Sequence, residues 1–235
     1  MDFLTHSYRW GVEHLHETNP AWVELQEVLS GISRRDVVVG QAAYVGAWMA
    51  GERQNPPTGG QTALNAIIHG RLQERGWQTQ VPVIPSEDGR GVVPYWSMDF
   101  LRDDIGVEVS FNNAGVLPQN LLRMSVKAES YRLRRDEMIR LGILIVASAG
   151  LKEWSRMDAT VHTFDQVVRV LDFVTFSVPT PMVLVGLNNS ADGGNIWPDT
   201  FLFPGSKPGP FRRLPEHVQE VWVDVYERET GRLAP

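Results

Sequence analysis

The chain has 235 residues, of which 43% are hydrophobic, and a formal net charge of −6. This length and composition predict a single domain with a full hydrophobic core, and the absence of cysteine excludes disulfides, thiolate metal sites and cysteine nucleophiles. No apolar run is long enough to span a membrane, and the N-terminus lacks the pattern of a secretory signal, so we expect a cytoplasmic protein without membrane contact.

Helical patterns dominate the first third of the chain. Apolar residues recur at helical spacing over 21–32, which predicts a helix. The segment 36–49 is rich in Val, Ala and Gly and fits a buried helix or strand. A loop rich in proline and glycine at 55–60 precedes a predicted helix over 62–75, for which Gly76 is a suitable C-terminal cap.

A β-hairpin is predicted near the middle of the chain. A short strand at 81–84 and a loop at 85–91 come first, and the hairpin then occupies about 95–111. A long helix is expected to start at Pro118 and run to about residue 141.

Two continuous apolar runs, at 142–148 and 181–187, predict strands buried on both faces. Between them, Thr163 opens a capping-box pattern for another helix. Residues 188–210 are too irregular for a core element, and 214–226 mixes helical and strand periods. The order of elements predicts an α/β fold built on a mixed β-sheet flanked by helices.

The predicted hairpin carries two acidic residues that its geometry brings together. If Asp99 ends one strand and 106–111 forms the next, Glu108 lies inside that second, apolar strand and the hairpin brings both carboxylates to one edge. Two converging carboxylates repel each other unless a cation lies between them, so the pair indicates a site for a hard divalent metal, most simply Mg²⁺. The alternative is that Glu108 forms an ion pair, for example with Arg102 or Arg123, because a buried unpaired carboxylate is rare.

The hairpin sequence is similar to a known active site. Asp99-Phe100 is followed nine residues later by Glu108-Val109-Ser110-Phe111, which resembles the hairpin of the PD-(D/E)XK nucleases and, more narrowly, of the type II restriction endonucleases of the BglII, BstYI and BamHI group. The resemblance extends to a preceding helix and two later strands and covers residues 60–187. It implies a restriction-endonuclease-like core, with 1–235 as a single nuclease domain and 188–213 as a region of DNA-recognition loops.

The same resemblance implies the residues of the catalytic centre. Asp99 and Glu108 would bind the metal together with the Val109 carbonyl, and Asn65 would lie near the metal-bound water. Asn65 is equally compatible with a surface position on its helix.

One signature position departs from the pattern. Ser110 stands where related enzymes have Lys, Gln or Glu, and serine is a poor general base at neutral pH. Ser110 either holds the attacking water by a hydrogen bond or marks a slow or inactive nuclease. Alternatively the missing group comes from elsewhere, and Lys127 in the triplet Ser125-Val126-Lys127 is a candidate.

Residues of three regions are expected to contact DNA. Asn112 and Asn113 follow the catalytic strand, where an amide can pair with adenine in the major groove, although two asparagines also suit a plain β-turn. Segment 120–140 holds six basic residues against three acidic ones, which fits a phosphate-binding surface or simply a solvated helix face. The further candidates are Arg123, Lys127, Asn188, Asn189, Ser190 and Asp192.

Together these features predict a type II restriction endonuclease, a homodimer that uses Mg²⁺ to cut a short palindromic site in double-stranded DNA. The relatives imply a GATC-centred site, a 5′ overhang and a companion DNA methyltransferase. The rival hypotheses are a repair or structure-specific nuclease, a catalytically silent DNA-binding protein, and an interaction protein that keeps only the fold.

Overall fold

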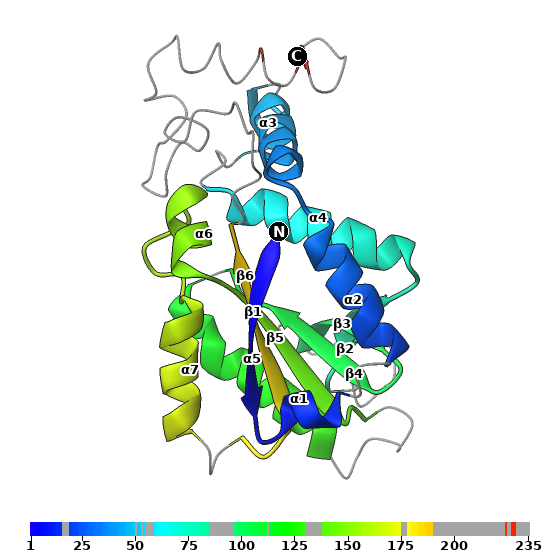
Figure 1. Cartoon of the computed structure of the whole chain (residues 1–235). Helices are drawn as coiled ribbons and strands as arrows, with labels where there is room; N and C mark the ends of the chain where they lie inside the picture. The colour runs from blue at the N-terminus through cyan, green and yellow to red at the C-terminus, as the bar shows by residue number, and fades with distance from the viewer. Residues whose placement is uncertain are drawn as a thin grey trace.

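In the part of the chain that the structure describes, six strands form one mixed sheet in the middle of the molecule, in the order β1-β6-β5-β4-β3-β2 (Figure 1). Strands β4, β5 and β6 are parallel to one another, whereas β1, β3 and β2 pair antiparallel with their neighbours. The strands are β1 (Asp2–Tyr8), β2 (Gln78–Pro82), β3 (Ser97–Arg102), β4 (Ile105–Val109), β5 (Leu141–Ala147) and β6 (Met182–Asn188). This computed structural model describes residues 1–15, 19–49, 51, 52, 54, 59–84, 96–111, 113–129, 138–174, 178–189, 224, 227 and 228.

Helices cover both faces of this sheet. One core cluster joins the inner sides of α2, α4 and α6 to one face, and a second joins α5 and α7 to the other. The helices are α1 (Gly11–His14), α2 (Pro20–Ser30), α3 (Arg34–Met49), α4 (Gln61–Glu74), α5 (Leu117–Glu129), α6 (Ala149–Trp154) and α7 (Phe164–Phe173), with a 3₁₀ turn η1 (Ala114–Val116) before α5.

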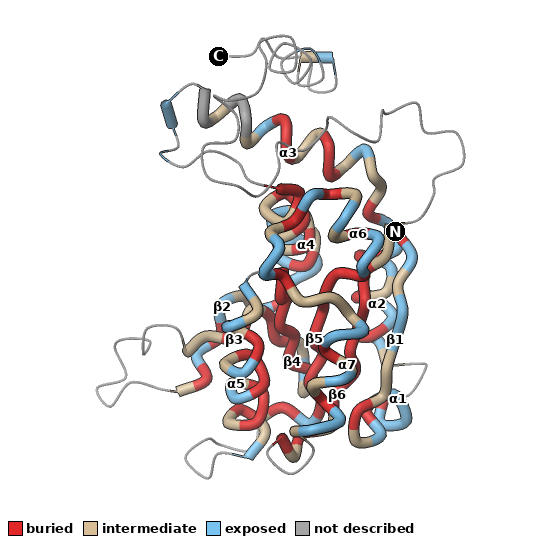
Figure 2. Tube along the Cα trace, turned by 90° about the vertical axis from the view of Figure 1, so that its left-hand side faces the viewer, coloured by how far each residue is buried: buried red, intermediate tan, exposed pale blue. Residues whose placement is uncertain are grey.

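Strand β5 shows why the central strands are continuously apolar. Ile143 and Ile145 pack into the first cluster, while Leu144 and Val146 pack into the second. Every residue of β5 is buried (Figure 2). A strand covered on both faces has no side for polar residues, so the alternating pattern of a half-exposed strand is absent.

Most of the predicted elements are confirmed. The helices expected at 21–32 and 62–75 correspond to α2 and α4, and the ambiguous segment 36–49 is the helix α3. Gly76 follows α4 with a φ of 82°, the left-handed conformation expected just beyond a helix end. The hairpin, the two buried strands and the capping box at Thr163 are also present.

The predicted end of the long helix was wrong. Within the described residues, α5 ends at Glu129 rather than near residue 141, and Ile139 and Arg140 are not helical. The backbone N–H groups of Arg140 and Leu141 donate to the carbonyl of Asp104 in the hairpin turn, which starts β5 at Leu141 instead. The sequence analysis also missed β1, α1 and α6, because β1 has no clean alternation and the two helices are short.

Several predictions concern residues outside the described part of the chain. These are the loops at 85–91 and 190–213, most of 214–226, and residues 130–137 with their arginines. The recognition-loop region therefore stays a prediction. Among the described helices, none is long and apolar enough to cross a membrane.

Candidate active site

The β3–β4 hairpin opens at the end that carries the acidic residues. Its backbone pairing runs from Arg102↔Ile105 to Phe100↔Val107 and stops there. Beyond that point the Asp99 carboxylate takes the place of the backbone: its Oδ2 accepts a hydrogen bond of 2.8 Å from the Val109 N–H. Continuing the register places Asp99 opposite Glu108, so the two carboxylates extend from the same face of the sheet.

Glu108 forms a bidentate ion pair with Arg123 of α5. Arg123 Nε donates to Glu108 Oε1 and Arg123 Nη2 to Oε2, both at 2.7 Å. The same Nη2 donates to Asn120 Oδ1, also at 2.7 Å. The Glu108 side chain is fully buried and that of Arg123 is 11% exposed. Of the two arginines considered from the sequence, Arg123 is the partner, while Arg102 lies 3.3 Å from Glu24.

Both carboxyl groups have raised pKa values. Burial, followed by the nearby Asp99 charge, raises the pKa of Glu108 to about 8, although Arg123 opposes this shift. Burial also raises the pKa of Asp99, against the Val109 N–H, the Arg123 charge and the Gln80 amide. A site in which two carboxylates resist ionisation gains stability when a cation binds between them.

A pocket of about 230 Å³ opens beside Asp99. Asn65 and His69 are four residues apart on α4, so both face it from one side of the helix. Gln80 of β2 donates to Asp99 Oδ1 at 3.3 Å, and the His69 ring lies 5.6 Å from the ring of Phe100. The lining residues are Asn65, His69, Gln80, Asp99, Phe100 and Val109.

The pocket thus brings together Asn65, Asp99 and Val109, three of the predicted site residues. His69 and Gln80 were not predicted from the sequence. The spacing of His69 from Asn65 would have indicated the first. Gln80 has no signal in the sequence, because it reaches Asp99 only through the pairing of β2 with β3.

Ser110 and Lys127 do not line this pocket. The Ser110 N–H donates to the Ile145 carbonyl at 2.8 Å, which extends the pairing of β4 with β5, and the residue is 5% exposed. The Lys127 ammonium donates to the Pro82 carbonyl at 3.1 Å and is also buried. Neither residue is among those that line the pocket, although Ser110 directly follows Val109, whose N–H binds the Asp99 carboxylate.

Comparisons with known proteins identify the family of the chain. The family model of the restriction endonuclease BglII/BglIII matches residues 3–187. The chain belongs to the BglII/BglIII restriction endonuclease family. It is a type II restriction endonuclease, an enzyme that cleaves DNA at specific sites, and its family generally uses a divalent metal.

A solved structure of BglII shows the same fold. The crystal structure of BglII complexed with a DNA 16-mer is 19% identical, covers 81% of this chain and 78% of that chain, and superposes with a TM-score of 0.58. Free BglII is likewise 19% identical over 81% of each chain, with a TM-score of 0.48. A search of curated proteins finds no match.

In this BglII-family enzyme, no cluster of three His, Asp or Glu side chains occurs among the described residues. Two carboxylates, Asp99 and Glu108, are the acidic groups that meet at the hairpin. A metal held there needs further oxygen ligands from the backbone or from water. Mg²⁺ suits such a set, because it retains several of its waters when bound by one or two carboxylates.

Asn113, one of the predicted DNA contacts, has a structural role in the described chain. Its Oδ1 accepts a hydrogen bond of 2.9 Å from the Gly115 N–H and caps η1. This agrees with the turn alternative and leaves DNA contact untested. Asn112 lies outside the described residues.

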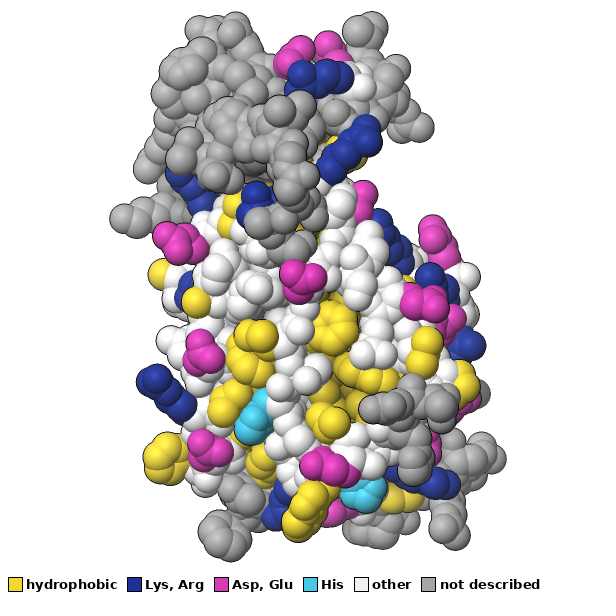
Figure 3. Space-filling model, viewed as in Figure 1, with side chains coloured by type: hydrophobic (Ala, Val, Ile, Leu, Met, Phe, Trp, Pro, Cys, Tyr) yellow, Lys and Arg dark blue, Asp and Glu magenta, His cyan; other side chains and the backbone are white. Residues whose placement is uncertain are grey.

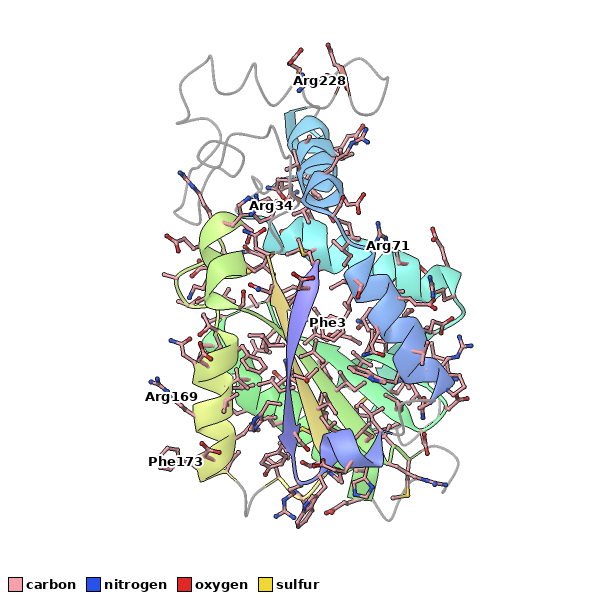
Figure 4. The ribbon with its side chains drawn as sticks, viewed as in Figure 1. Phe3, Arg34, Arg71, Arg169, Phe173 and Arg228 are labelled. Carbon is pink, nitrogen blue, oxygen red and sulfur yellow. The ribbon has the colours of Figure 1, made fainter. Side chains whose placement is uncertain are left out.

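Asn188 and Asn189 at the end of β6 are held by other side chains. The Ser148 hydroxyl donates to Asn188 Oδ1 at 2.8 Å, and Arg34 Nε donates to Asn189 Oδ1. Arg34 lies where α3 begins (Figure 4), and its guanidinium is 5.3 Å from the ring centre of Trp154. These asparagines stay predicted DNA contacts, and Ser190 and Asp192 lie outside the described residues.

Proposed function

We propose that this enzyme hydrolyses both strands of a short palindromic DNA site with Mg²⁺, as a homodimer. The observation that carries the proposal is the open end of the β3–β4 hairpin. There, Asp99, Val109 and Asn65 line one pocket, and Glu108 interacts with the Asp99 carboxyl group. The GATC-centred site and the 5′ overhang rest on the sequence resemblance alone.

The residues present fit a magnesium ion. The carboxylates of Asp99 and Glu108 and the Val109 carbonyl would hold it, because Mg²⁺ prefers oxygen ligands. When bound, the ion supplies positive charge for the scissile phosphate and makes its own water more acidic. Hydrolysis breaks the P–O3′ bond and leaves 5′-phosphate and 3′-hydroxyl ends.

The polar side chains of the pocket would orient the attacking water. Asn65 and His69 face the pocket from α4, and Gln80 holds Asp99 in place by its hydrogen bond. Because serine is a poor general base and the Lys127 ammonium is bound to the Pro82 carbonyl, we propose that neither accepts the proton of this water. Solvent in the pocket would take it instead.

The partners follow from the family and the resemblance. A DNA partner is consistent with the BglII structure that contains a DNA 16-mer. A two-fold symmetric homodimer would match a palindromic site, and a companion DNA methyltransferase would protect the host genome. A cytoplasmic location would give the enzyme access to incoming DNA.

Digestion of unmethylated phage DNA in Mg²⁺ tests the proposal, with Asp99→Asn as the inactive control. We expect discrete fragments from the wild type and none from the variant. Sequencing of the fragment ends would give the recognition site and the stagger. Absence of cleavage at every enzyme concentration, also in Mn²⁺ and on methylated DNA, would contradict the proposal.

A second candidate, a DNA-binding protein without activity, is favoured by two observations. Ser110 replaces the usual third signature residue, and Glu108 is paired with Arg123. This candidate predicts specific retardation of duplex DNA in Ca²⁺ together with no cleavage in Mg²⁺ or Mn²⁺.

A further inference from the structure

The predicted metal site contains a cation of its own. Arg123 engages both oxygens of Glu108, the oxygens that a metal ion would need. The Glu108 side chain is fully buried and does not line the pocket that Asp99 borders. In this arrangement Glu108 binds an arginine, and only two of the three proposed metal ligands, Asp99 and Val109, line the pocket.

Arg123 is itself held in position. Asn120 lies one helical turn before it on α5 and accepts a hydrogen bond of 2.7 Å from Nη2. Both side chains sit on the face of α5 turned toward the hairpin, and Asn120 is buried. An acceptor in this position helps to keep the guanidinium on Glu108, since a bidentate arginine–carboxylate pair has little freedom of orientation.

The charges around the pair explain why a cation is needed there. Asp99 and Glu108 face each other across the open end of the hairpin, and the positive charge of Arg123 acts on both carboxyl groups. A guanidinium and a divalent metal therefore satisfy the same two negative charges. They compete, because Glu108 cannot offer the same oxygens to both.

We propose that Arg123 is a positioning residue. In the DNA-free enzyme its guanidinium supplies the positive charge that a metal ion would supply, so a metal ion binds to all of its ligands only after Arg123 leaves Glu108. This inference rests on the proposed function, because it takes Glu108 as a metal ligand. Arg123 then acts before DNA binds, because it prevents the DNA-free protein from forming a complete metal site.

Calcium binding to the DNA-free protein tests this directly, by isothermal titration calorimetry at pH 8.5. We expect Arg123→Gln to bind Ca²⁺ about tenfold or more tightly than the wild type, within the usual range of coupling between two sites. A purely structural arginine would give the opposite result, because its loss would disorder the site and weaken Ca²⁺ binding. Equal or weaker binding by a folded Arg123→Gln protein would overturn the proposal.

Breaking a buried ion pair can also unfold a protein, so a second variant is required. Asn120→Ala retains both charges and removes only the contact that steadies Arg123. We expect it to raise Ca²⁺ affinity by about two- to fivefold, a coupling at the lower end of the usual range. No gain in Asn120→Ala would overturn the proposal if Arg123→Gln does not fold.

The matched control is Arg140→Gln. Arg140 pairs with Asp104 at 3.1 Å at the opposite, closed end of the same hairpin, and its side chain is 84% exposed. The Ca²⁺ affinity of the Arg140→Gln protein should equal that of the wild type. If the wild type cleaves DNA while neither site variant gains affinity, only the inference about Arg123 fails. If no variant binds Ca²⁺ and the wild type does not cleave, the proposed function fails with it.

Discussion

At the scale of single residues, Asp99 has two roles. Its carboxylate is a proposed metal ligand, and it also accepts the Val109 N–H at the point where the β3–β4 pairing ends. Asparagine retains an acceptor for that N–H but has no charge. Substitution by asparagine therefore separates the electrostatic role of this residue from the structural one.

We predict that Asp99→Asn stabilises the metal-free protein at high pH. A carboxyl group whose pKa is raised in the folded protein stabilises the folded state at a pH below its unfolded pKa. This stabilisation is lost as the pH rises through the pKa of the folded state, which is about 8 for Glu108. Without the Asp99 charge, the protein loses less folding stability as the pH rises. In EDTA at pH 8 we expect the Tm to rise by about 2–4 °C, equivalent to about 1 kcal/mol for a domain of this size, with a smaller difference at pH 5.

Thermal melting at the two pH values measures this difference. Asp99→Ala is the matched control, because it removes the same charge and also leaves the Val109 N–H without its acceptor. An Asp99→Asn protein that is less stable than the wild type at pH 8 would contradict the electrostatic explanation.

The raised pKa of Glu108 also predicts that metal affinity depends on pH. With a pKa raised to about 8, Glu108 is increasingly protonated as the pH falls below that value, and a metal must displace the proton. The affinity of the wild type for Ca²⁺ should therefore increase between pH 6.5 and 8.5, by up to about tenfold for each pH unit below the pKa. Calorimetry at several pH values would show the trend, and a flat profile would mean that Glu108 ionises at its ordinary pKa.

At the scale of elements, the contact between α7 and β6 depends on a glycine. A Cβ added at Gly186 would lie 2.5 Å from the ring of Phe164, which opens α7. Gly70 on α4 has no atom within 4 Å of such a Cβ. These two glycines provide a matched pair of substitutions to alanine.

We expect Gly186→Ala to destabilise the protein by about 1–3 kcal/mol, since overpacking of a core forces side chains from their rotamers. Gly70→Ala should stabilise it by about 0.5–1 kcal/mol, because alanine loses less backbone entropy in a helix. Urea unfolding of both variants measures the two changes. Similar effects in the two variants would show that the α7–β6 contact adapts to the added methyl group.

The strands and the contacts between elements show what the sequence could predict and why. Strand β5 was predicted because it is apolar along its whole length, whereas β1 was missed because its residues are mostly half-exposed or exposed without alternation. Asn65 and Asp99 were expected to lie together, and they do. Gln80 could not be foreseen, and the choice between a metal and Arg123 for Glu108 stayed open, because both depend on contacts between distant elements.

At the scale of the whole molecule, the net charge of −6 does not resemble that of a general DNA-binding protein. On the face that Figure 3 shows, the described acidic and basic side chains are scattered over the surface, and hydrophobic side chains gather near the middle. Phe173, which is 88% exposed at the end of α7, points away from the core (Figure 4). Binding to DNA would then rely on local positive charge near the site rather than on overall charge.

A homodimer makes a prediction at this scale. Sedimentation should give twice the chain mass of 26.4 kDa, and supercoiled plasmid with one site should be converted to linear DNA with little nicked intermediate, since two active sites act on one palindrome. The Asp99→Asn variant should also sediment as a dimer. A monomeric mass with accumulation of nicked circles would contradict the symmetric assembly.

The pairing of β1 with β6 has a consequence for synthesis of the chain. Asp2 lies opposite Asn188, so the first strand to be made pairs with the last strand of the sheet. At about 5–20 residues per second, roughly 10–40 s separate the two during translation. Throughout that interval β1 has no strand to join, and β6 must find it across most of the chain. Contacts this distant in sequence slow folding, so closing the sheet with β1 is expected to be a late step as the protein leaves the ribosome.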